Sequence, residues 1–127
     1  MAPRLIEHSA STLVDMLKAE EVTPIDLLDA LEERIGEVDG KVNALPTLCF
    51  DRARKHAAAL MKLPVGQRGR LAGMPVPIKD LVEVEGVRTT FGSAIYAEHV
   101  PDQSDILVQN LEREGGVIYA KSATPEF

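Results

Sequence analysis

The sequence predicts an α/β protein in which N-terminal helices precede the start of a mixed β-sheet flanked by helices. Apolar residues recur at helical spacing over the first part of the chain, whereas residues 74–79 alternate with a period of two, as in a strand. A helical pattern over 105–114 then separates this strand from a short apolar run at 117–120. Strand, helix and strand in this order predict a βαβ unit with parallel strands.

The chain of 127 residues has the length of one domain. We divide it into a mainly helical lead-in, residues 1–64, and a βαβ segment, residues 65–127, with turn-rich sequence between them. This change in composition does not by itself define two independent domains. Hydrophobic residues make up 45% and aromatic residues 4%, which indicates a core built mainly from aliphatic side chains.

The lead-in is predicted to form a hairpin of two helices. Ser9 or Ser11 can cap the first helix, which runs to about residue 19. Thr23 precedes Pro24 at the start of the second helix, and the Asp-Gly pair at 39–40 predicts its end. We expect both apolar faces to pack onto the chain's own domain. A dimerisation or partner-docking arm is the alternative, and it leaves a homodimer open.

The next segments are a strand and a third helix. Residues 42–50 are the strand candidate, and Pro46 within them favours an edge position because proline cannot donate a ladder hydrogen bond. Asp51 can cap a helix that begins at residue 52 and runs to about 63. The lone Cys49 excludes an internal disulfide, and its apolar context favours a buried, inert thiol over a nucleophile.

Lys79 is the candidate for chemistry. The alternation around it places its side chain on the strand face opposite Ile78, and the prolines at 75 and 77 again favour an edge strand. A lysine among prolines and apolar residues, just before a glycine-marked loop, is expected to be buried and fixed. Burial lowers a lysine pKa from its reference of about 10.4, and a neutral amine can act as a base.

The same pattern has a simpler interpretation, because most strand lysines point to solvent. Neighbouring Asp80 is expected to face the other side of the strand and not to meet Lys79. Thr90 and Ser93 carry hydroxyls near the lysine in sequence, and Ser122 carries one at the expected end of the last strand. We expect them to satisfy loop and strand-end backbone groups instead of acting as nucleophiles.

The last helix and strand complete the βαβ unit. Ser104 or Asp102 can cap the helix at 105–114, and Gly115-Gly116 ends it before the strand at 117–120. The buried face of this helix is expected to hold Ile106, Leu107 or Val108, and Leu111.

Four motifs occur in order over the second half of the chain. They are the PxPIKD core at 75–80, the xGxxTTxGS loop at 85–93, a V-x-x-L-x-x-x-G-G-V helix at 108–117 and the closing KSATPEF at 121–127. This ordered set resembles the N-terminal part of an amidase signature hydrolase of the general amidase type. The lysine of the PIKD core belongs to a Ser–Ser–Lys triad in that family, so the resemblance implies a catalytic role for Lys79. The family's two serines lie further downstream, and no GGSSGG-like segment occurs before Phe127.

The resemblance implies an amidase that hydrolyses the C–N bond of a small-molecule carboxamide through an acyl-enzyme, without a cofactor or metal. It implies a specificity pocket built largely by residues after Phe127. With only the lysine present, the isolated chain is expected to be inactive. A non-catalytic fragment or interaction module is one alternative. The A subunit of a tRNA-dependent glutamyl/aspartyl amidotransferase is another, although that subunit usually carries aspartate where this chain has Pro125.

Charge and patterning disfavour other classes of protein. The net charge of −6 argues against a nucleic-acid surface, which needs clustered lysine and arginine. The three histidines, at 8, 56 and 99, lack metal-ligand spacing. No apolar run of membrane-spanning length and no signal-peptide core occur in the sequence, so we expect a cytoplasmic protein without a membrane segment.

Overall fold

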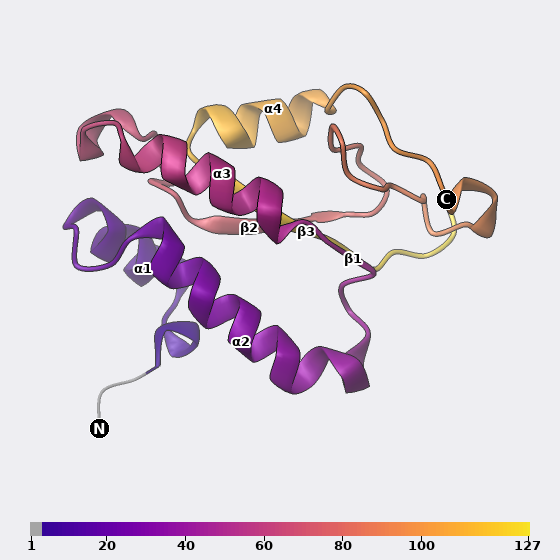
Figure 1. Ribbon diagram of the computed structural model, residues 1–127, viewed down its shortest axis with the longest axis horizontal. Helices are drawn as coiled ribbons and strands as arrows, with labels where there is room; N and C mark the ends of the chain where they lie inside the picture. Colours follow the sequence, from indigo (N-terminus) through magenta and orange to yellow (C-terminus); the bar gives the residue numbers. More distant parts are fainter. Residues whose placement is uncertain (1–3) are drawn as a thin grey trace.

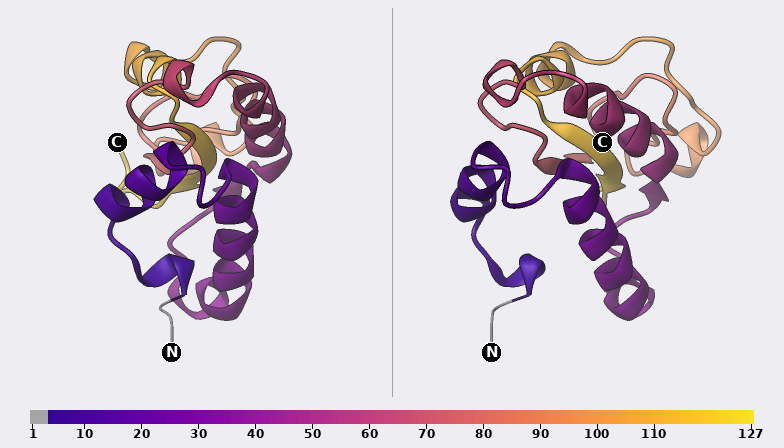
Figure 2. Two further views of the ribbon diagram at one scale, coloured as in Figure 1. Left: turned by 90° about the vertical axis from the view of Figure 1, so that its left-hand side faces the viewer. Right: turned by 60° about the vertical axis from the view of Figure 1, so that its left-hand side comes forward.

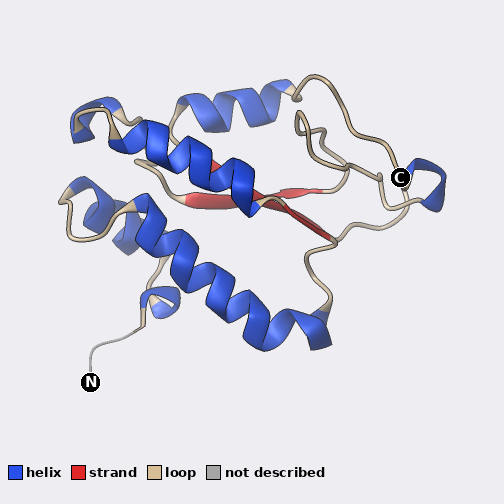
Figure 3. Ribbon diagram, in the orientation of Figure 1, coloured by secondary structure: helices blue, strands red, loops and turns tan. Residues whose placement is uncertain are grey.

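The computed structural model describes residues 4–127, and over this part it confirms the α/β prediction (Figures 1 and 3). The helices are α1 (Ala10–Lys18), α2 (Pro24–Val42), α3 (Phe50–Met61) and α4 (Ile106–Arg113). The strands are β1 (Thr47–Leu48), β2 (Pro75–Lys79) and β3 (Val117–Ser122). Short 3-10 turns occur at Leu5–Glu7, Val65–Gln67 and Ala94–Tyr96.

The three strands form a mixed sheet in the order β1-β3-β2. The central strand β3 pairs with β1 in the antiparallel sense and with β2 in the parallel sense. The predicted βαβ unit is therefore confirmed as β2–α4–β3. Within the described residues β1 and β2 are the two edges of the sheet, as the prolines near β1 and in β2 predicted.

Helices cover both faces of the sheet, and Figure 2 shows β3 lying between α4 and α2. One core cluster joins α2 and α3 to β3 through Leu28, Phe50 and Val117. A second cluster joins α4 to the other face through Val108 and Ile118. The sheet is thus the middle layer between α4 on one side and the α2–α3 pair on the other.

The helical hairpin packs onto the chain itself, as expected. Leu13 and Leu17 of α1 are buried against Leu27 of α2 and against Ala72, which lies just before β2. Ser9 caps α1, because its hydroxyl accepts a hydrogen bond from the Thr12 N–H at 3.1 Å. These contacts explain how the first two helices are held near the sheet.

The central strand contains a β-bulge at Tyr119. In the register, Val76 lies opposite Ile118, but the next residue, Pro77, lies opposite Ala120. Tyr119 is therefore an extra residue on β3. One inserted residue reverses the alternation of side chains between the two faces of a sheet.

This bulge decides the surroundings of Lys121. The residue lies opposite Ile78 in the register, on the face that packs against α4. Without the bulge, Lys121 and Ile118 would point to opposite faces, because they are three residues apart. Ser122 lies opposite Lys79, so these two residues share the α2–α3 face of the sheet.

Two predicted boundaries in the lead-in are wrong. Helix α2 continues through Gly40 to Val42 and ends at Asn43, whose φ of 55° is left-handed. Asp39 supports this end because its Oδ1 accepts a hydrogen bond from the Ala44 N–H at 2.8 Å. The predicted strand at 42–50 shrinks to β1, since only two of its residues pair with β3.

The start of α3 also differs from the prediction. The helix begins at Phe50 with Cys49 at the cap position, and Asp51 lies inside its first turn. The Cys49 side chain makes no capping hydrogen bond. The Asp51 charge still suits the first turn, because a carboxylate there interacts favourably with the helix dipole.

Helix α4 corrects two further expectations. Asp105 is its cap and accepts from the Leu107 N–H at 2.8 Å, whereas Ser104 accepts a hydrogen bond from the Glu85 N–H. Ile106 is 71% exposed and Leu107 50% exposed, while Val108 is fully buried. The helix meets the sheet along one narrow stripe, so only part of the apolar surface predicted from spacing is buried. Strand β3 also extends two residues beyond its predicted end.

The chain after α4 passes close to the Arg68 backbone at Gly115, and comparison with Gly86 tests how much this contact matters. A Cβ on Gly115 would lie 2.0 Å from the carbonyl oxygen of Arg68, whereas a Cβ on Gly86 would meet nothing within 4 Å. Both glycines have a positive φ, 85° and 74°, so alanine costs roughly 1–2 kcal/mol at either position.

We expect Gly115→Ala to lower the free energy of unfolding by about 1–3 kcal/mol more than Gly86→Ala, because it adds a backbone clash. Urea unfolding of both variants measures the difference. Equal losses would show that the contact with Arg68 is unimportant.

Candidate active site

Lys79 is the last residue of β2, and its side chain is exposed. The prediction that it lies opposite Ile78 is confirmed, since Ile78 is buried in the α4 face of the sheet. The expected burial of Lys79 is wrong for this chain. Its strand is an edge strand of the sheet, and Lys79 is the last residue of that strand.

The backbone around Lys79 is nevertheless fixed. Its carbonyl oxygen accepts a hydrogen bond from the Val82 N–H at 2.9 Å. The Asp80 N–H donates to the Ser122 carbonyl, and the Asp80 carbonyl accepts from the Phe91 N–H, both at 2.9 Å. The strand end, the following turn and the loop at 86–93 are therefore bonded together around a free side chain.

The Asp80 side chain is buried on the face opposite Lys79, as expected. It is 2% exposed, and its carboxylate accepts from the Thr90 N–H at 3.1 Å and from the Thr90 hydroxyl at 2.5 Å. Its Oδ1 also lies 3.3 Å from the Lys121 Nζ. The Asp80 carboxylate is therefore paired with Thr90 and Lys121, and it does not pair with Lys79.

Lys121 is a fully buried lysine that the sequence pattern did not single out. Its Nζ donates to Asp80 Oδ1, to the Val82 carbonyl at 2.6 Å and to the Thr89 hydroxyl at 2.9 Å. Burial lowers the pKa of its ammonium, and the nearby Asp80 carboxylate opposes this change. The sequence signal that could have indicated its burial is a lysine at the end of an apolar strand. Its acidic partner Asp80 is 41 residues away in sequence, so the pair was not predicted.

The hydroxyls near Lys79 do the local work expected of them. Thr90 Oγ1 accepts from the Gly92 N–H at 3.2 Å, and Ser93 Oγ accepts from the Ile95 N–H at 3.3 Å. Thr90 additionally donates to Asp80, which ties the loop to the end of β2. Ser122 ends β3 beside Lys79 in the register.

A cavity of about 350 Å³ lies beyond the carboxyl ends of β2 and β3. Asp80, Thr90, Ser93 and Thr124 contribute to its walls. Crevices at this end of parallel strands are where α/β sheets bind ligands. Polar groups from both strand ends and from the intervening loop therefore meet at the expected edge of the sheet.

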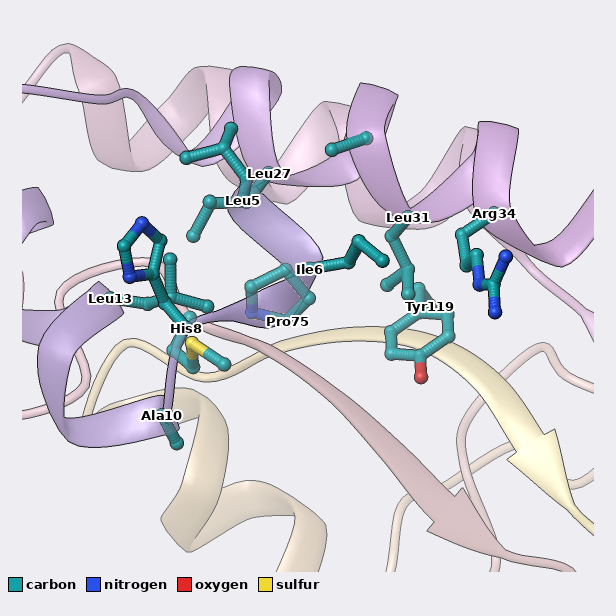
Figure 4. Close-up of a pocket in the computed structure, with 12 residues that line it drawn as sticks. Leu5, Ile6, His8, Ala10, Leu13, Leu27, Leu31, Arg34, Pro75 and Tyr119 are labelled. Carbon is teal, nitrogen blue, oxygen red and sulfur yellow. The ribbon is translucent and has the colours of Figure 1, made fainter. Parts of the chain in front are cut away.

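A second cavity, of about 490 Å³, lies between the N-terminal helices and the sheet. Figure 4 shows Leu27 and Leu31 of α2 on one side and Pro75 and Tyr119 of the sheet on the other. Its lining is mainly apolar, and Lys79 lines neither this cavity nor the one at the strand ends. His8 is the one histidine in this lining, and it comes from the N-terminal segment and not from the strand ends.

Cys49, His56 and His99 lie in surroundings that favour a structural role. Burial raises the pKa of the Cys49 thiol to about 11, which keeps the thiol protonated near neutral pH and agrees with an inert cysteine. His56 Nδ1 lies 3.5 Å from a Glu112 oxygen, and burial lowers the pKa of His56. His99 Nε2 lies 2.8 Å from a Glu83 oxygen. Across residues 4–127, no helix combines the length and apolarity needed to cross a bilayer.

A mixed sheet between helices, with polar groups gathered at the carboxyl ends of its parallel strands, is the arrangement of an α/β enzyme. The family model for Amidase matches residues 26–127. The chain belongs to the amidase family, among the amidase signature enzymes, and corresponds to their N-terminal portion.

Curated relatives agree with this assignment over nearly the whole chain. The A subunit of the glutamyl-tRNA(Gln) amidotransferase of Halothermothrix orenii is 40% identical over 123 residues, which are 97% of this chain and 24% of the relative. The corresponding protein of Shouchella clausii is 37% identical over 123 residues, 97% of this chain and 26% of the relative. The chain therefore spans about a quarter of the length of these relatives.

Solved structures share the fold. PAM12A is 27% identical, with a TM-score of 0.87 over 98% of this chain and 26% of that structure. An amidase crystal structure is 32% identical, with a TM-score of 0.80 over 94% of this chain and 27% of that structure. A bacterial aryl acylamidase of the amidase signature family, at 24% identity and a TM-score of 0.81, supports the fold alone and covers 93% of this chain and 25% of that structure.

Proposed function

We propose that the full-length protein hydrolyses the C–N bond of a small-molecule carboxamide through a Ser–Ser–Lys triad, with Lys79 as its lysine. The observation that carries this proposal is the placement of Lys79 within the PIKD motif. It stands at the carboxyl end of a parallel strand, with its backbone bonded on both sides and its side chain free. The side chain is available to groups supplied from outside residues 4–127.

In the proposed reaction, neutral Lys79 takes a proton from a bridging serine, which activates a second serine to attack the amide carbonyl. Protonated Lys79 then helps to return a proton to the leaving amine as the C–N bond breaks. Water hydrolyses the resulting acyl-enzyme. Both serines would come from sequence beyond this chain, so we expect the isolated 127 residues to be inactive.

The proposed setting is the cytoplasm, without a cofactor or metal. The single Cys49 suits a reducing compartment, where disulfides are rare. The acidic net charge of −6 gives no support for direct nucleic-acid binding by this portion of the protein. A homodimer is compatible with the proposal but is not required by it.

The second candidate function is that of an amidotransferase A subunit. The curated relatives described above carry that name, at 37–40% identity. Such a protein would work as one subunit of a complex that acts on glutamyl-tRNA(Gln). It would not act alone on simple amides. Pro125 is the residue in this chain that favours the general amidase, through the resemblance of the closing motif.

The test compares the full-length protein with the isolated chain of residues 1–127 on a simple aryl amide and on glutamine. We expect the full-length protein to hydrolyse the aryl amide and the isolated chain to show no turnover above background. Ammonia release from glutamine only in a complex with other subunits would favour the amidotransferase. Clear turnover by the isolated chain would overturn the Ser–Ser–Lys assignment, and a full-length protein inert under all conditions would favour a non-catalytic role.

A further inference from the structure

The ion pair of Asp80 and Lys121 joins three segments at the point where Lys79 leaves β2. Lys121 comes from β3, Asp80 begins the turn after β2, and Thr89 and Thr90 belong to the loop that follows. The Lys121 Nζ donates to Asp80 and Thr89, while the Asp80 carboxylate accepts two hydrogen bonds from Thr90. One ammonium and one carboxylate therefore close a buried network across strand, turn and loop.

The network reaches the Lys79 backbone in two steps. The Lys121 Nζ donates to the Val82 carbonyl at 2.6 Å, and the Val82 N–H donates to the Lys79 carbonyl at 2.9 Å. The Asp80 N–H, next to Lys79, donates to the Ser122 carbonyl on β3. A shift of either charged side chain would consequently move the backbone that carries Lys79.

Stability alone does not account for such a pair. Replacing both members of a buried ion pair by apolar groups of similar size is often neutral or stabilising, because desolvation offsets the attraction. The pair is 0% and 2% exposed and lies on the α4 face, while the Lys79 side chain leaves on the opposite face. The pair can therefore act on Lys79 through the backbone and not through contact with its side chain.

We infer that Asp80 and Lys121 are positioning residues that hold Lys79 in place for proton transfer, an inference that rests on the proposed function. Neither side chain touches the reacting atoms. Supporting residues of this kind keep a catalytic group within a fraction of an ångström of its productive geometry. A misplacement of about 1 Å can lower a rate by about 10²-fold.

The test uses the full-length protein and one amide substrate. The double variant Asp80→Asn/Lys121→Met removes both charges at similar size. The matched control is Arg52→Gln/Glu112→Gln, which removes a half-buried, two-bonded ion pair between α3 and α4. For the Asp80/Lys121 variant we expect kcat to fall about 10–100-fold with KM changed by less than about threefold. The control variant is expected to keep kcat, although its unfolding midpoint falls.

The outcomes separate this inference from the proposed function. If Lys79→Ala keeps normal turnover, the proposed function fails and the inference fails with it. If Lys79→Ala is inactive but the folded Asp80/Lys121 variant keeps wild-type kcat, only the positioning role is overturned. If the double variant does not fold, Thr89→Val replaces it, because valine removes one acceptor of the Lys121 Nζ. We then expect kcat to fall about threefold or more, and an unchanged kcat overturns the inference.

Discussion

Replacing Lys79 by alanine in the full-length protein is expected to lower kcat for amide hydrolysis by about 10²–10⁴-fold, the usual contribution of a positioned acid–base group. The loss follows because, among residues 4–127, the two charged side chains beside Lys79 cannot take over its role. The neighbouring carboxylate of Asp80 faces away, and the nearest buried amine, Lys121, points to the α4 side of the sheet. Steady-state kinetics on an aryl amide measure the effect.

Two further variants make this prediction specific. Lys79→Arg keeps the positive charge but cannot give up its proton near neutral pH, so we expect a loss similar to that of alanine. Lys62→Ala removes an exposed lysine next to the end of α3 and should leave kcat unchanged. Activity retained by Lys79→Arg would mean that the residue acts as a charge and not as a base.

Lys121→Met is expected to have the largest effect on folding. The substitution leaves the Asp80 carboxylate buried without its cation, and breaking a buried pair in this way costs about 3–5 kcal/mol. Asp80→Asn/Lys121→Met removes the carboxylate as well and should recover most of that loss. The free energy of unfolding of the full-length protein, measured in urea, provides the comparison.

The matched control for stability is Arg52→Met, which breaks the pair with Glu112. Both side chains of that pair are about a quarter exposed, at 26% and 23%. Water can solvate the remaining carboxylate, so we expect a loss of about 1 kcal/mol or less. If Lys121→Met cost no more than Arg52→Met, the buried network would have little energetic weight.

Local chemistry made several elements of the fold predictable. Ser9 caps α1 and Thr23 caps α2 because a hydroxyl at a helix start satisfies backbone donors within the next turn. The prolines of β2 marked an edge strand for a similar local reason, since they lack the N–H that a central strand needs. Predictions that depended on neighbours in space were less successful.

The predictions for α2 and α4 were wrong because they depended on contacts with residues that are distant in sequence or outside the helix. Helix α2 continues past Gly40 because its end is formed later. Asn43 takes the left-handed conformation that ends the helix, and the Asp39 side chain accepts a hydrogen bond from the Ala44 N–H. Ile106 and either Leu107 or Val108 fit a buried helical face by spacing, but only Val108, together with partly buried Leu111, packs into the core. Spacing identifies which residues share a face, and only packing decides how much of that face is covered.

Some features of the candidate site also followed from the sequence, whereas others depended on the tertiary structure. The sequence determined the strand that carries Lys79, the face on which it lies and the motifs that place the chain in the amidase family, because alternation and motif order are properties of contiguous residues. Tertiary structure decided that Lys79 is exposed and Lys121 buried. The bulge at Tyr119 reverses the alternation of β3 and turns Lys121 toward Asp80, whose side chain it meets only because β2 and β3 pair in parallel.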